Sequence, residues 1–202
     1  MNKRKSMLVP GWQFNCVMSQ AQTGTLLKLK DEIKFWMDNS TDARRSSYNG
    51  TLDPVFRSTL LEAVVGESDV DVAEKIKFLV DQHHAQVDIC KLFESGQTLL
   101  QRAVFGHRTE AVLARLTHGA DPDKRQSMYA ASMYVYAAEK NLINVFTAMT
   151  RAGADLYQTN SFGETAIVVS VRRGHLEITA EILQRGVTPD WYTFEDRMTL
   201  LH

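Results

Sequence analysis

The chain has 202 residues, of which 44% are hydrophobic and 23% charged, and its formal net charge is −1. This composition is ordinary for a soluble folded protein, and the near-neutral balance excludes a global field that attracts nucleic acid or an anionic membrane. No stretch approaches the roughly 18 apolar residues of a membrane span. Because Cys16 and Cys90 lie far apart, they exclude a disulfide scaffold and a zinc-ligand spacing. We expect a cytoplasmic protein with two buried, reduced thiols.

The first elements that the sequence predicts are a pair of helices near the N-terminus. Residues 14–23 form one predicted helix, Gly24 marks the turn, and residues 26–37 form the second helix. Leu29 and Ile33 belong to an apolar stripe on that second helix, with lysines and acidic residues opposite. The pair is degenerate, as terminal units of stacked arrays commonly are, because they cap the stack.

A second predicted pair follows, and it is longer than those that come after it. Ser58 opens its first helix at the position that Thr98 takes in the next unit. The acidic stretch between Gly66 and Val72 accounts for part of the extra length. The second helix carries Ile76 and other apolar residues at helical spacing.

From Thr98 onward, a segment pattern returns at a nearly constant interval of about 33 residues. The residues that open the three units are Thr98, Ser132 and Thr165, and those that close them are Gly119, Gly153 and Gly186. In the last unit, Thr165 is the expected N-cap, and its hydroxyl is expected to satisfy free backbone N–H groups. Gly174 ends the first helix in a left-handed conformation. A fixed period of this size indicates one supersecondary unit stacked on copies of itself.

These units resemble the ankyrin repeat family, whose pattern runs roughly G-x-T-P-L-H-x-A-A, then G-H, a second helix and G-A-D. The matching positions are Gly96-Gln97-Thr98, Gly119-Ala120-Asp121, Gly153-Ala154-Asp155, Gly163-Glu164-Thr165 and Gly174-His175. The repeats are divergent, because Leu99, Met133 and Ala166 stand where the family has proline. The resemblance implies an all-α, ankyrin-type helical solenoid of about five helix pairs with short hairpin loops.

The resemblance also implies a division of the chain. The expected parts are a degenerate N-terminal capping pair (1–52), a stretched repeat (53–92), three repeats (93–126, 127–159 and 160–193) and the start of a truncated next repeat (194–202). The last part rests on Thr199-Leu200-Leu201-His202, which lies one repeat period after Thr165 and matches T-P-L-H closely. We expect the chain to be cut from a longer array.

The family presents hairpin tips and the outer face of each first helix on a concave binding surface. Carried onto this chain, that surface holds Arg102, Phe105, Lys124, Arg125, Tyr136, Glu139, Tyr157, Arg172, Arg173, Trp191 and Tyr192. Aromatic residues and arginine are enriched at binding hot spots. The basic members could form a stripe that favours an acidic or phosphate-bearing ligand, and the alternative is scattered, solvated charge.

No pattern for catalysis, a cofactor or a metal stands out. His83 and His84 are adjacent, so on a helix their side chains point about 100° apart and cannot chelate one metal well. We expect them at the solvent-facing end of a helix, and we expect a structural role for His175 at its turn. The chain has no G-x-S-x-G elbow, no phosphate-binding glycine loop and no H-E-x-x-H motif.

The sequence therefore predicts a non-enzymatic protein-interaction module, part of an adaptor or of a pathogen effector, that holds another protein on its concave surface. It predicts no cofactor and no nucleic-acid partner. One alternative is the targeting arm of a longer enzyme or toxin whose catalytic part lies beyond residue 202. Another is a structural array that associates end to end through the open C-terminal repeat. The expected compartment is the cytoplasm, or the host cytosol for a secreted effector.

Overall fold

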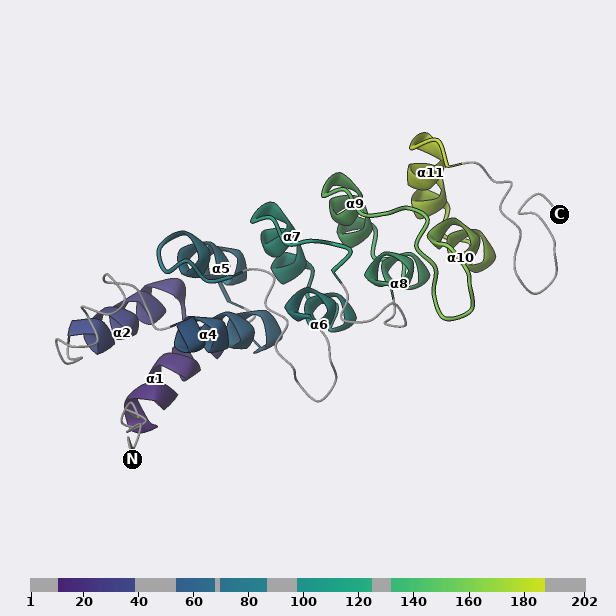
Figure 1. Ribbon diagram of the computed structural model, residues 1–202. Helices are drawn as coiled ribbons and strands as arrows, with labels where there is room; N and C mark the ends of the chain where they lie inside the picture. Colours follow the sequence, from purple (N-terminus) through teal and green to yellow (C-terminus); the bar gives the residue numbers. More distant parts are fainter. Residues whose placement is uncertain (1–10, 39–53, 68–69, 87–97, 125–131, 188–202) are drawn as a thin grey trace, which may run out of the picture. The chain divides into compact units, whose positions relative to one another are not determined.

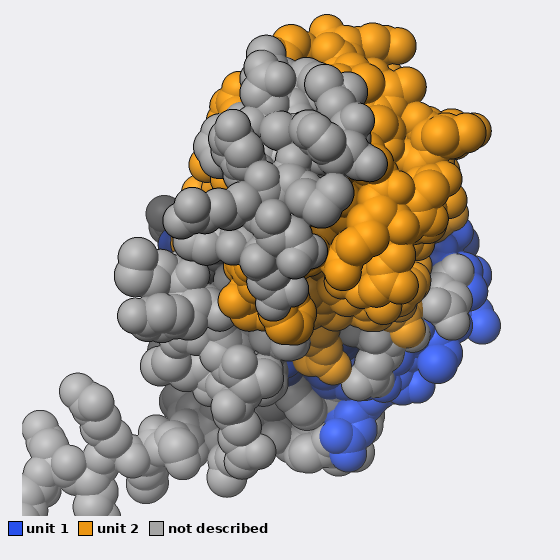
Figure 2. All heavy atoms as spheres, turned by 90° about the vertical axis from the view of Figure 1, so that its right-hand side faces the viewer, with its two compact units in different colours: residues 1–86 blue, residues 87–202 orange. Residues whose placement is uncertain are grey.

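The computed structural model describes residues 11–38, 54–67, 70–86, 98–124 and 132–187. Over these ranges the protein is all-helical, with ten helices and no strand, as the sequence predicts. The chain divides into two compact units, Met1–Gln86 and Val87–His202, which Figure 2 draws in blue and orange. Each unit has a helical core of its own, so the two are described in turn.

The first unit contains four described helices, in which α1 packs on α2 and α4, and α4 packs on α5. Their bounds are Gly11–Gln22 for α1, Leu26–Asp38 for α2, Pro54–Glu67 for α4 and Val72–Asp81 for α5. Leu29, Ile33, Leu60, Ile76 and Leu79 are at most 2% exposed and form its core. The predicted N-terminal pair is present, and its first helix begins three residues earlier than expected.

Two further expectations concern the cysteines and the end of the chain. Cys16, on α1, is a free thiol that is half-buried, so the expectation of full burial is wrong for this residue. Cys90 and the predicted start of a further repeat, residues 194–202, lie outside the described ranges.

Helix α4 begins at Pro54, four residues before the start that the alignment on Ser58 predicts. Proline suits the first turn of a helix, because its missing N–H would have no intrahelical acceptor there. With 14 residues, α4 is twice as long as the seven-residue α6. The expectation of a first helix starting at Ser58 is therefore wrong.

The second unit contains three consecutive helix pairs (Figure 1). Their bounds are Leu99–Phe105 and Thr109–Thr117 for α6 and α7, Met133–Glu139 and Ile143–Arg151 for α8 and α9, and Ala166–Arg173 and Leu176–Gln184 for α10 and α11. Each first helix packs on its own second helix, and α6, α8 and α10 follow one another in one layer. The second helices α7, α9 and α11 form the other layer. The core of the unit lies between these two layers.

The backbone of these pairs repeats at the same period as the sequence. Between the two helices of each pair, His107, Asn141 and Gly174 adopt φ of 57°, 55° and 72°. Glycine visits this left-handed region freely, and asparagine and histidine tolerate it better than most residues. Gly174 has the predicted left-handed conformation. In the two preceding pairs the equivalent left-handed positions are taken by His107 and Asn141, and Gly106, directly before His107, has an ordinary φ of −80°.

The three residues that open the first helices take N-cap positions, but they differ in their hydrogen bonds. Thr98 forms a full capping box with Gln101, and the Ser132 hydroxyl accepts a hydrogen bond from the N–H of Val135 at 3.3 Å. Thr165 occupies the same position, yet its buried hydroxyl has no hydrogen-bond partner among the described residues. The predicted capping hydrogen bond of Thr165 is therefore not formed.

Candidate protein-interaction surface

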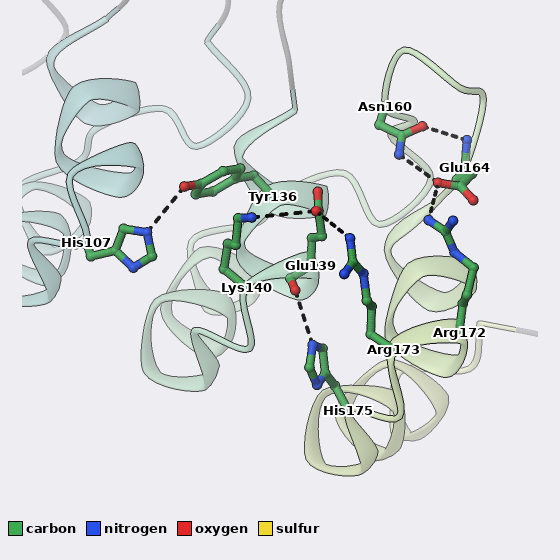
Figure 3. A network of polar contacts seen from close by, with 9 residues as sticks. All are labelled: His107, Tyr136, Glu139, Lys140, Asn160, Glu164, Arg172, Arg173 and His175. Atoms are coloured by element: carbon green, nitrogen blue, oxygen red, sulfur yellow. Dashed lines mark hydrogen bonds and ion pairs between the residues drawn. The ribbon is translucent and has the colours of Figure 1, made fainter.

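Tyr136, near the middle of α8, gathers side chains from two neighbouring helix pairs. The ring of Phe105, the last residue of α6, meets it edge-on, with 4.7 Å between ring centroids and 81° between ring planes. His107 Nε2 lies 3.3 Å from Tyr136 Oη, and Lys140 Nζ lies 5.6 Å from the centre of its ring (Figure 3). Edge-on aromatic pairs and cation–π contacts are both favourable at this spacing. The tyrosine is thus fixed in a half-buried aromatic and cationic setting.

Glu139, the last residue of α8, connects this cluster to the next helix pair. Its Oε1 accepts a hydrogen bond from Arg173 of α10 at 2.9 Å and lies 3.6 Å from Lys140 Nζ. His175 Nε2 lies 3.1 Å from the backbone oxygen of Glu139 (Figure 3). That oxygen belongs to the last turn of α8, where carbonyl groups lack intrahelical partners. His175 therefore has the structural role at its turn that the sequence predicts.

The loop before α10 supplies a second set of contacts. Arg172 donates to Glu164 Oε2 at 2.8 Å, and the Asn160 amide donates to the same oxygen at 2.9 Å (Figure 3). Asn160 Oδ1 accepts hydrogen bonds from the backbone N–H groups of Phe162 and Glu164. These bonds fix the loop tip with the side chain of Phe162 70% exposed. Tyr157, in the same inter-repeat segment, is 48% exposed.

The ion pairs bear on the predicted basic stripe. Arg172 and Arg173 are each paired with a carboxylate, and their side chains remain 57% and 51% exposed. Exposed pairs of this kind contribute up to about 1 kcal/mol each to stability. They do, however, offset the positive charge locally. The described part of this face therefore carries both signs of charge around these two arginines. The predicted basic stripe would instead have a row of cations without carboxylate partners.

Of the predicted surface residues, the structure brings Phe105 and Tyr136 together, and likewise Glu139 and Arg173. Arg102 and Lys124 are half-buried and have interactions of their own. Three predicted surface residues fall outside the described ranges: Arg125, Trp191 and Tyr192.

Five residues of the contacts drawn in Figure 3 were not among the predicted surface residues: His107, Lys140, Asn160, Glu164 and His175. His107 stands one repeat before Asn141 and two repeats before Gly174, in the same register. The sequence contains this register, but only the last of the three positions is a glycine, so a search for a turn glycine does not find the other two. Glu164 precedes Thr165 directly, so its place at the tip also follows from the repeat register.

The expectation for the histidine pair is wrong for one of its members. His84 is exposed, but His83 is only 6% exposed and packs edge-on against Phe78 with 4.9 Å between centroids. Arg57 donates a hydrogen bond to the His83 carbonyl oxygen. Burial, followed by the nearby charges of Arg57 and His84, lowers the pKa of His83 below its usual 6.5. The chain turns at His84, where φ is 53°, and Ala85 directly after the turn is buried.

Within the described ranges, no group of three or more His, Cys, Asp or Glu side chains could hold a metal ion. None of the helices in those ranges combines the length and the apolar character that crossing a membrane requires. No protein-family model matches the chain, and no curated protein matches its sequence. The resemblance to ankyrin repeats thus rests on the period, the turns and the caps of the chain itself.

Proposed function

We propose that this chain is a divergent ankyrin-type helical array that acts as a non-enzymatic protein-interaction module. The observation that carries the proposal is the recurrence, once in each repeat period, of the same turn between paired helices. In such an array each unit contacts only its neighbours, which leaves a long surface free for recognition. The three pairs of the second unit supply side chains from successive units to one such surface.

We assign recognition to the network surface, which consists of the nine residues drawn in Figure 3 together with Phe105. Its aromatic and arginine side chains are of the types that dominate binding energy at protein interfaces. Contacts within and between pairs hold Tyr136 and Arg173 in place before a partner arrives. Side chains that are held in advance lose less conformational entropy on binding, which favours affinity.

The charge of this surface favours a protein partner over a polyanion. Glu164 and Glu139 offset the charges of Arg172 and Arg173, so a nucleic acid would have to displace carboxylates to reach the guanidinium groups. A protein can satisfy both signs of charge, because its surface carries both. The module is proposed to act in the cytoplasm, as an adaptor or as a pathogen effector within a host cell.

The test combines capture of a partner with matched substitutions. The immobilised chain is used to isolate a binding protein from a cell lysate, and the identified protein is then purified for affinity measurements. Tyr136→Ala combined with Arg172→Ala should weaken its binding at least about tenfold. Arg151→Ala is the control, because Arg151 is an exposed arginine at the end of α9 that lies outside the network surface.

Circular dichroism should show the same helical signal for the wild type, the double variant and the Arg151→Ala control. Equal affinity of the wild type and the double variant for the captured protein would remove the network surface as the binding site. A loss of affinity in Arg151→Ala as large as that in the double variant would do the same.

A further inference from the structure

A cavity of about 420 Å³ lies in the first unit, between α2 and the end of α5. Its apolar wall consists of Ile33 and Met37 from α2 and Phe78 from α5. Ile33 is 2% exposed and Phe78 is 8% exposed, so both are held in the core of the unit. Small-molecule sites are commonly cavities of roughly 300–1,000 Å³ that combine an apolar wall with a few polar groups. The cavity is therefore large enough for a ligand with a short apolar body.

Two lysines from α2 give the cavity positive charge. Lys30 and Lys34 both line it and lie four residues apart, so they share one side of the helix. Lys30 Nζ lies 5.2 Å from the centre of the Phe78 ring, which places this ammonium group at the apolar wall. Neither lysine forms an ion pair with any of the described residues. Within the described part of the chain, no carboxylate therefore offsets these two charges through a direct contact.

His83 supplies a second, independent indication of a binding site. It lines the cavity, it is 6% exposed, and its Nδ1 has no hydrogen-bond partner among the described residues. A buried polar atom that the fold leaves unsatisfied costs stability, and a bound water, ion or ligand is one explanation for its presence. Burial and, after it, the charge of Arg57 lower the pKa of His83. The effect of Arg57 means that the potential at the imidazole is positive, which favours an anion nearby.

One carboxylate, that of Asp38, also lines the cavity. Asp38 is exposed and is the last residue of α2, so it lies about 12 Å from Lys30 along the helix axis. It also has an interaction of its own. The polar lining thus places two ammonium groups and an imidazole along the apolar wall, against a single carboxylate at the end of α2.

We propose that this cavity binds a small organic carboxylate, whose charged group lies beside Lys30 and Lys34 and whose apolar body contacts Met37 and Phe78. The lysines would donate charge-assisted hydrogen bonds, which are stronger than neutral ones. Burial of the apolar body supplies the hydrophobic part of the affinity. The site belongs to the first unit, so the proposal does not depend on the function assigned to the network surface of the second unit.

Octanoate and phenylacetate are suitable probes, because one has a linear and the other an aromatic apolar body. Each is titrated into the full chain while the backbone amide signals of α2 and α5 are followed by NMR. Saturable shifts are expected in these helices, with a dissociation constant in the millimolar range or below, as suits a ligand of few atoms. Octanamide and phenylacetamide have the same bodies without the charge, and they should bind at least about fivefold more weakly.

Lys30→Met combined with Lys34→Met removes both charges and keeps most of the side-chain volume. This double variant should raise the dissociation constant of octanoate at least about fivefold. Lys28→Met is the matched control and should leave it within about 1.5-fold of the wild type, because Lys28 is an exposed lysine of α2 that does not line the cavity. Circular dichroism and a thermal melt verify the fold of each variant. Lys34 is exposed, so Lys34→Met alone should fold, and it should raise the dissociation constant about twofold or more.

Absence of saturable shifts with both carboxylates would overturn the proposal. Residues 39–53 follow α2 directly and lie outside the described ranges, and this is the result expected if they filled the cavity in solution. Equal affinity for the carboxylates and their amides would also overturn it, because the lysine charges would then play no part. A loss of affinity in Lys28→Met as large as that in the double variant would indicate attraction to the general charge of α2, and so would contradict a defined site.

Discussion

The ammonium group of Lys75 donates a 3.1 Å hydrogen bond to the backbone oxygen of Ala21, and the lysine side chain is fully buried. Lysine is almost never buried without a partner, because its charge loses hydration there. Ala21 lies in the last turn of α1, where a cation is favourable and the carbonyl has no intrahelical donor. The nearby Asp71 carboxylate accepts a hydrogen bond from the N–H of Leu26, the first residue of α2, at 2.9 Å. The start of α5 thus holds both sides of the turn between α1 and α2.

Replacing Lys75 should show how much this connection contributes to stability. Lys75→Ala removes buried methylene groups and leaves the Ala21 carbonyl without this donor, so it should lower the free energy of unfolding by about 2–4 kcal/mol. Lys75→Met keeps most of the volume and removes the buried charge, so it should cost less than half as much. Urea unfolding followed by circular dichroism measures both. Equal losses for alanine and methionine would contradict a role for side-chain volume.

The two threonine caps of the second unit form a matched pair. Thr98→Val removes a hydroxyl that accepts from Gln101 N at 3.1 Å, so it should destabilise the protein by about 1–2 kcal/mol. Thr165→Val removes a buried hydroxyl that has no partner among the described residues, so it should be neutral or stabilising. Thermal and urea unfolding of the two variants measure these changes in stability. A larger loss at Thr165 than at Thr98 would show that the Thr165 hydroxyl is satisfied in solution.

Tyr134 should make the stability of the protein depend on alkaline pH. Its side chain is 1% exposed, stacks on Phe146 at 4.3 Å and shares a 3.1 Å hydrogen bond with Thr150. Burial raises the pKa of Tyr134 to about 12, against 10.0 for an unperturbed tyrosine. The unfolded chain therefore loses this proton first as the pH rises, so the contribution to stability is complete below about pH 10 and is lost between about pH 10 and 12.

Tyr134→Phe should remove this alkaline component and cost about 1 kcal/mol at pH 8, because the hydrogen bond to Thr150 is lost. The comparison uses urea unfolding of both proteins at pH 8 and pH 11. If the wild type and the phenylalanine variant lost equal stability between these two pH values, the tyrosine would not be the group responsible.

His83 should make the stability of the protein fall as the pH decreases through the acidic range. Its folded-state pKa is lowered by burial, so the unfolded chain binds a proton first as the pH falls. The contribution of the neutral side chain is complete above about pH 6.5 and is lost as the pH falls below that value. His83→Gln should therefore show a shallower loss of stability between pH 7.5 and pH 5 than the wild type. Parallel pH profiles for the two proteins would exclude His83 as the source.

The sequence predicts the helical class and the left-handed turn at Gly174, because both depend on local chemistry. Gly174 adopts a left-handed conformation that glycine reaches freely, and it is found there as expected. The equivalent left-handed positions are His107 and Asn141, and neither is a glycine that would mark the conformation in the sequence. The start of α4 at Pro54 differs from the expected Ser58, because the repeat register favours Ser58, whereas a proline suits the first turn of a helix.

For the candidate sites, the sequence by itself determined which residue types are present and that they recur at a fixed register. Only the tertiary structure decided which of them meet. It paired Arg173 with Glu139 across two helix pairs, turned His83 into the core and left Leu183 exposed where its register equivalents are buried. The physical reason is that helix period and turn chemistry are local, whereas ion pairing and burial depend on side chains that lie far apart along the chain, which only the packed helices bring together.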